Sequence, residues 1–148
     1  AHAIFAKGKY AKAIEDLKKL ALKGGEIGES ADALAKDFIK RLEGKFARVD
    51  WLLENAYLVK AEEAFDDLAK ATKGVEELAE KTAALQATFD AEDMKEEMKA
   101  AKELAKLEEK LMEDGLDAKI LKKIAKFAES NADKKVAKRA QHLVSLGE

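Results

Sequence analysis

Cysteine and proline are both absent from this chain of 148 residues. Without cysteine, the chain can form no disulfide, thiolate zinc site, Cys-x-x-Cys redox pair or cysteine nucleophile. Proline removes a helical N–H and clashes with the preceding turn of a helix. Its absence therefore favours a chain that is nearly all helix with short connections, and it leaves a designed origin open.

An excess of charge of one sign is also missing, because 28 Lys and Arg residues nearly balance 30 Asp and Glu residues. A nucleic-acid partner needs a basic surface, and no basic run interleaved with aromatic residues occurs. No apolar run approaches the roughly 18 residues that span a bilayer. We therefore predict a soluble chain with no nucleic-acid partner and no membrane insertion. Because the chain begins with Ala1, we expect a processed product or a piece of a longer protein.

What the chain does have is helical periodicity along its whole length. Tyr10, Ala13, Ile14 and Leu17 follow the spacing i, i+3, i+4 and i+7, which places them on one stripe of a helix. No segment alternates apolar and polar residues with the period of two that a strand requires. We therefore predict an all-α fold of six or seven helices, paired into antiparallel hairpins by short turns. The expected helices cover residues 10–21, 31–54, 58–69, 75–85, 92–113, 116–127 and 132–146.

Short polar side chains and glycines suggest where these helices begin and end. Ser30, Asp90 and the pair Ser130-Asn131 are the expected N-caps, and Asn55 is expected to end a helix in the left-handed conformation. The glycine-rich residues 24–28 are interpreted as a flexible hairpin connection. Gly44 lies inside a long helix, where it costs about 1 kcal/mol relative to alanine or marks a bend or a close helix contact.

A weak internal repeat gives the expected domain organisation. Residues 17–21, 65–69 and 121–125 match one another, and each is followed by a short connection and a second helix. The repeating unit is then a helical hairpin, because a helix pair buries its apolar face only by stacking on neighbours. We predict one domain over residues 1–148. Its hairpins would cover about 1–54, 56–88 and 116–147, with an extra helix at about 92–113.

The first hairpin resembles a tetratricopeptide repeat. In that family a Gly, a Tyr two residues later and an Ala three further on mark the turn and second helix, as Gly8, Tyr10 and Ala13 do here. The second unit keeps Ala61 and Phe65 but not the Gly and Tyr. The proline that closes each repeat is missing, and the matched segments are spaced more widely than usual. The chain therefore resembles a degenerate tetratricopeptide-like array, and the resemblance implies a surface for a peptide or protein partner.

A looser resemblance links the chain to helical extensions of bacterial thioredoxin-like proteins. The order "hairpin, long charged helix, hairpin" carries this similarity. In those proteins a separate redox domain holds the cysteine pair, and this chain has no such pair. The resemblance implies an accessory domain of a larger protein.

Nothing in the sequence predicts an enzyme active site, a metal or a cofactor. The two histidines, His2 and His142, are too few to converge on a metal ion. No Glu-x-x-His motif of the di-metal bundle proteins occurs. Adjacent carboxylates flank the apolar stripes, so we interpret them as solvated faces. These pairs are Glu62-Glu63, Asp66-Asp67, Glu76-Glu77, Glu96-Glu97 and Glu108-Glu109.

The candidate binding residues are Arg48, Trp51 and Tyr57, because Arg, Trp and Tyr are enriched at interface hot spots. Trp51 lies slightly off the centre of its stripe, which leaves two alternatives: the rim of a groove, or the core. We predict a non-catalytic helical-repeat module for protein–protein interaction or scaffolding. The alternatives are an accessory domain of a larger protein, or a self-associating structural or designed helical protein whose partner is a second copy.

Overall fold

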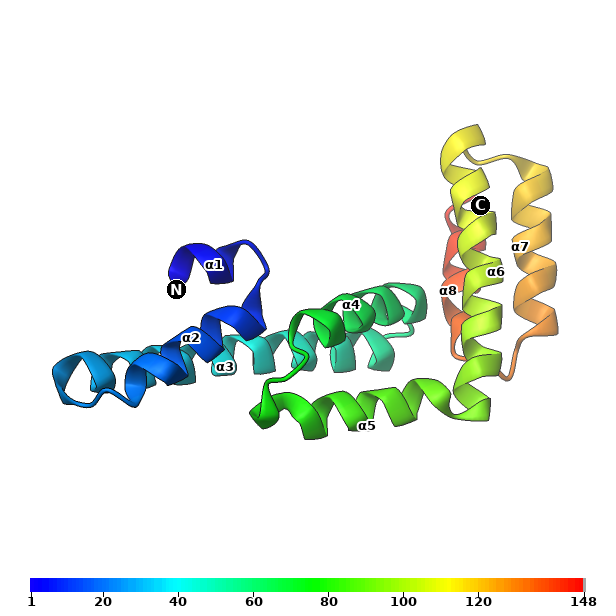
Figure 1. Cartoon of the computed structure of the whole chain (residues 1–148). Coiled ribbons are helices and arrows are strands. Elements are labelled where there is room, and N and C mark those ends of the chain that lie inside the picture. Colours follow the sequence, from blue (N-terminus) through cyan, green and yellow to red (C-terminus); the bar gives the residue numbers. More distant parts are fainter. Residues whose placement is uncertain (148) are drawn as a thin grey trace. The chain divides into compact units, whose positions relative to one another are not determined.

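The computed structural model describes residues 1–147, which contain α-helices and no strand (Figure 1). The all-α prediction is therefore confirmed. The predicted count missed the first helix, whose five residues are too few to show a helical period. No helix among the described residues is both long and apolar enough to cross a membrane. The helices are α1 (His2–Ala6), α2 (Tyr10–Ala21), α3 (Gly25–Glu54), α4 (Leu58–Ala71), α5 (Ala79–Asp90), α6 (Glu92–Asp114), α7 (Ala118–Ser130) and α8 (Val136–Ser145), with a 3-10 turn η1 (Glu76–Leu78) before α5.

The chain divides into two compact units, which are described one at a time. Unit 1 comprises Ala1–Trp51 and Glu62–Ala87. Unit 2 comprises Leu52–Ala61 and Thr88–Glu148, of which residue 148 lies outside the described part. The expectation of a single domain built from three stacked hairpins stays a prediction.

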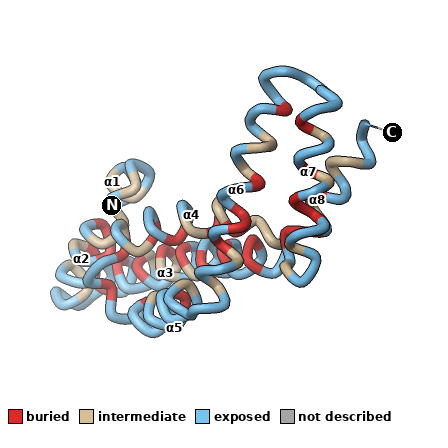
Figure 2. Tube along the Cα trace, turned by 90° about the vertical axis from the view of Figure 1, so that its right-hand side faces the viewer, coloured by how far each residue is buried: buried red, intermediate tan, exposed pale blue. Residues whose placement is uncertain are grey.

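The core of unit 1 is organised by α3. Phe38, Leu42, Phe46 and Val49 recur every three to four residues and are almost fully buried, as a helix with one apolar stripe requires. The short α1 rests on this stripe through Phe5, whose ring stacks on that of Phe38 with 4.0 Å between centroids. Figure 2 shows the buried positions recurring at intervals along the helices. Ile14, Phe65 and Leu78 are the other large side chains of this unit that are almost fully buried.

An ion pair also ties α2 to η1 within unit 1. Lys18 Nζ lies 2.6 Å from Glu77 Oε1. The hydrogen bond that Lys18 donates lowers the pKa of Glu77 below its usual value.

The connection predicted at residues 24–28, which lies between α2 and α3, was too long. The turn follows Ala21 through Leu22 and Lys23, and Gly24 and Gly25 complete it with φ angles of 69° and 65°, which glycine permits. Helix α3 begins at Gly25, so Ser30 lies inside the helix rather than at its cap. Gly28 is buried in the first turns of α3, where it packs against the end of α2.

Two further N-cap predictions were wrong. Asp90 is the last residue of α5, and α6 begins after Ala91, whose backbone is extended. Ser130 and Asn131 end α7 instead of starting α8, and Asn131 is the C-cap of α7. The cap of α8 is Lys135. Short polar residues serve both ends of helices, so their presence alone did not show which end they occupy.

Helices α6, α7 and α8 form an up–down–up bundle in unit 2 (Figure 1). Helix α6 ends at Asp114, and Gly115 begins the turn to α7 with a φ of 72°. Asp117 then caps α7 by accepting hydrogen bonds from the backbone N–H groups of Lys119 and Ile120. The predicted extra helix at about 92–113 corresponds to α6. The bundle buries Leu104, Ile124, Val136 and Ala140 almost completely.

Candidate functional site

A basic stripe runs along α8 and its cap. Lys135, Lys138, Arg139 and His142 follow the spacing i, i+3, i+4 and i+7, which places their side chains on one face. The opposite face of α8 carries Val136, Ala137 and Ala140, which are buried in the bundle. The amphipathic pattern that folds α8 onto its neighbours therefore also presents this basic stripe outward.

The stripe lines one side of a groove with a volume of about 510 Å³. The other side is the turn between α3 and α4, residues 54–57, which belongs to the same unit. That turn contributes one carboxylate, from Glu54, and one aromatic ring, from Tyr57. The groove thus combines several cations with a ring and a single acid.

Arg139 is held in a fixed orientation beside the groove by Glu108 of α6. Its Nε donates to Glu108 Oε1 at 2.5 Å, and its Nη2 donates to Oε2 at 2.9 Å. This two-pronged pairing uses the planar fork of the guanidinium group and fixes its plane as well as its position. The hydrogen bond to Glu108 also raises the pKa of Arg139 above its usual value, so this side chain stays charged at every physiological pH.

Tyr57 is positioned by a Schellman motif at the end of α3. The N–H of Tyr57 donates to the carbonyl of Leu52 at 2.8 Å, and that of Ala56 donates to Leu53 at 3.2 Å. Asn55 was predicted to take the left-handed conformation, but Ala56 takes it, with a φ of 60°. The motif places the left-handed residue one position after the helix cap, and Asn55 is that cap.

The ring of Tyr57 lies beneath two cations. The guanidinium carbon of Arg139 lies 5.1 Å from the ring centroid, and Lys60 Nζ lies 5.8 Å from it. Both distances fall within the range of cation–π attraction. Glu108, Arg139 and Tyr57 therefore form a connected row across α6, α8 and the α3–α4 turn.

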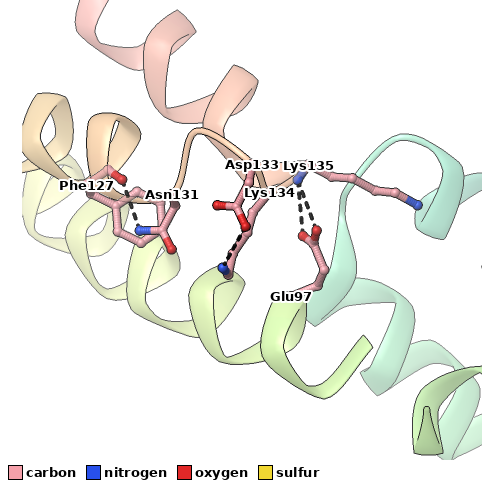
Figure 3. A network of polar contacts seen from close by, with 6 residues as sticks. All are labelled: Glu97, Phe127, Asn131, Asp133, Lys134 and Lys135. Atoms are coloured by element: carbon pink, nitrogen blue, oxygen red, sulfur yellow. Dashed lines mark hydrogen bonds and ion pairs between the residues drawn. The ribbon is translucent and has the colours of Figure 1, made fainter. Parts of the chain in front are cut away.

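A second carboxylate of α6 fixes the start of α8 (Figure 3). Both oxygens of Glu97 accept from the backbone N–H of Lys135, at 3.2 and 3.1 Å. Glu97 and Glu108 are eleven residues apart, which is close to three helical turns, so both point from one face of α6 toward α8. A negative charge at a helix N-terminus is favourable because it neutralises the partial positive charge there.

Replacing Glu97 by alanine is expected to lower the free energy of unfolding by about 0.5–2 kcal/mol, the typical loss of a helix cap. Urea denaturation followed by circular dichroism would measure it. Glu96→Ala is the matched control, because Glu96 is exposed and adjacent, and we expect its effect to stay within about 0.5 kcal/mol. Equal losses in the two variants would show that Glu97 does not cap α8.

The three candidate residues belong to different units. Arg48 and Trp51 lie on α3 in unit 1, and Tyr57 belongs to unit 2. Trp51 is 53% exposed, so the core alternative for this residue was wrong. Of the three, Tyr57 lines the groove. Binding by any of them stays a prediction.

The residues that sequence reasoning missed are the basic residues of α8 and the two carboxylates of α6 that organise it. Glu97 and Glu108 were interpreted as parts of solvated faces, but both are half-buried and bind α8. One signal was visible: no acidic residue occurs between Lys134 and Gly147. A helix that carries cations without acidic neighbours cannot neutralise its own charge.

Chemically, this arrangement can hold an anionic group, because it offers cations and N–H donors around a ring. Among residues 1–147, no three His, Asp or Glu side chains lie close enough together to hold a metal ion. Comparisons of this chain with protein-family models, with curated proteins and with solved structures gave no match.

Proposed function

We propose that this chain is a non-catalytic helical module that binds a protein or peptide partner, with the groove beside Tyr57 and Arg139 as its binding surface. The observation that carries this proposal is the fixed pairing of Arg139 with Glu108 next to an aromatic ring. Tyr and Arg are the types that contribute most at interfaces. A side chain that is already ordered loses less conformational entropy when a partner binds.

Two further observations support the proposal. Ala56 is the one non-glycine residue with a positive φ among residues 1–147, and it lines the groove. Such strain costs about 1–2 kcal/mol for a residue with a Cβ atom, and it concentrates at functional sites. The resemblance of residues 8–17 to a tetratricopeptide repeat, a family of helical interaction modules, supports the same class of function.

The test is the selection of binding peptides from a random library displayed on phage, with the whole chain immobilised. Enriched peptides would then be synthesised and their affinities measured by calorimetry. Because an aromatic hot spot contributes about 2 kcal/mol or more, we expect Tyr57→Ala to weaken binding at least tenfold. Circular dichroism would first establish that the variant is folded.

Trp51→Ala is the informative comparison, because Trp51 is the exposed aromatic candidate of the other unit. We expect this change to leave the affinities unaltered. A loss in Trp51→Ala but not in Tyr57→Ala would move the binding surface to α3. A library that yields no binding peptide would contradict the proposed function itself.

A further inference from the structure

We propose that the groove selects an acidic peptide segment, one that presents Asp or Glu side chains at alternate positions of an extended chain. This inference rests on the proposed function and adds the chemistry of the partner. It is carried by the charge, the geometry and the remaining hydrogen-bond capacity of α8.

Arg139 of the stripe is paired with Glu108, but its two lysines have no such partner among residues 1–147. Elsewhere, lysines pair with carboxylates one helical turn away, as Lys36 does with Asp32 at 2.6 Å and Lys12 with Asp16 at 3.4 Å. Among residues 1–147, no carboxylate lies within ion-pair distance of the ammonium group of Lys135 or Lys138. Both side chains are exposed, so their charges are available to a partner. An acidic ligand would supply the counter-charge that the helix lacks.

Arg139 retains capacity for a second carboxylate. A guanidinium group has five N–H donors, and Glu108 engages one on Nε and one on Nη2. A hydrogen bond to Tyr57 occupies a third donor, and the pairing with Glu108 has already fixed the plane of the donors that remain. An incoming carboxylate therefore meets an ordered donor group rather than a mobile side chain.

The length of the stripe matches a short extended peptide. Seven residues separate Lys135 from His142, which corresponds to about 10 Å along a helix axis. An extended chain advances about 3.3 Å per residue, so three or four residues cover that distance. Side chains on one side of an extended chain recur every second residue, about 7 Å apart. Two carboxylates at this spacing reach the first and second turns of α8 together.

An acidic peptide fits these features better than a nucleic acid does. Single-stranded nucleic acids bind by stacking bases on exposed aromatic faces along a basic track. Here Arg139 and Lys60 already stand over the ring of Tyr57, so its faces are not free for a base.

The experiment uses the whole chain and three fluorescein-labelled probes in an anisotropy titration at low salt. The first probe is a ten-residue peptide of alternating Glu and Ser, the second has Gln in place of each Glu, and the third is an oligo-dT of similar length. We expect the Glu peptide to bind at least tenfold more tightly than the other two. Its affinity should also fall as salt is added, because the contacts are ionic.

Charge-reversed variants locate the site. Lys135→Glu combined with Lys138→Glu should weaken binding of the Glu peptide at least tenfold, and the corresponding double change to Gln should weaken it by a smaller factor. A glutamate at position 135 would lie next to Glu97 and could disturb the fold. The Gln variant removes the positive charges without adding negative ones, so it tests the site in that case as well. The control is Lys122→Glu with Lys123→Glu on α7, which carries the same change in charge at exposed positions outside the groove. We expect less than a threefold effect there.

Three results would overturn the inference: equal binding of the Glu and Gln peptides, equal losses in the α7 control, or tighter binding of oligo-dT. Failure of the acidic-peptide inference can be distinguished from failure of the proposed function by the results of the peptide library. Library peptides that depend on Tyr57 but carry no acidic preference would retain the proposed function and refute its acidic partner. A library without binders would refute both.

Discussion

Replacing Phe38 by alanine is expected to lower the free energy of unfolding by about 3–5 kcal/mol. Phe38 is fully buried at the centre of the apolar stripe of α3. Its ring stacks on Phe5 at 4.0 Å between centroids and meets the edge of His2 at 5.3 Å. The truncation removes these contacts and leaves a cavity that a close-packed interior fills only in part. A loss of this size is a large fraction of the 5–15 kcal/mol that stabilises a typical domain.

Urea denaturation would measure the change, and the chain contains its own probe. Trp51 is the single tryptophan and lies on the same helix as Phe38. Phe5→Ala is the matched control, since it removes the same ring from the half-buried side of the same stack. We expect it to cost less than half as much, because a partly exposed ring gains less from burial. A Phe38→Ala loss below that of Phe5→Ala would contradict the placement of Phe38 in the core.

Helix positions were predictable from the sequence because burial imposes a period. The stripe of Met98, Ala101, Leu104 and Leu111 gave a helix at about 92–113, and α6 spans Glu92–Asp114. Periodicity is a property of many residues, so single exceptions do not disturb it. Helix α1 has five residues and could not be recognised in this way.

Helix ends were less predictable because each end depends on one or two residues. The same residue types occur at the N-terminal and the C-terminal ends of helices. Asn55 has the side chain that best tolerates the left-handed conformation, yet Ala56 adopts it. The backbone hydrogen bonds of Ala56 and Tyr57 to the last turn of α3 set this geometry. The gain from those bonds exceeds the roughly 1–2 kcal/mol that the left-handed conformation costs a residue with a Cβ atom, and the conformational preference of a single residue cannot reveal this balance.

The site was predictable only where one side chain gave the signal. Tyr57 was selected for its residue type, and it does line the groove. Arg139 and Glu108 are 31 residues apart, and no local pattern joins them. Their pairing follows from the packing of α6 beside α8, which requires the bundle geometry. The acid-free run from Lys134 to Gly147 was the one local feature that indicated a basic face.

Two glycines of α3 also show that the sequence does not reveal which residues meet a neighbouring helix. Alanine substitutions at these two glycines are expected to have opposite effects on stability. A Cβ atom on Gly28 would lie 2.8 Å from the carbonyl oxygen of Ala21, a backbone atom that cannot rotate away. Gly44 has nothing within 4 Å of the corresponding position and is exposed. From the sequence we predicted that Gly28 belongs to a loop. For Gly44, a close contact between helices was one of the explanations. The close approach is at Gly28.

We expect Gly28→Ala to lower the free energy of unfolding by about 1–2 kcal/mol, since the cost of overpacking exceeds the gain in helix propensity. Gly44→Ala should raise the same free energy by about 0.5–1 kcal/mol, because alanine loses less backbone entropy and meets no obstacle. Both changes add one methyl group to the same helix, so their difference isolates the contact with α2. If Gly28→Ala were as stabilising as Gly44→Ala in urea denaturation, α2 and α3 would not approach as closely as the structure places them.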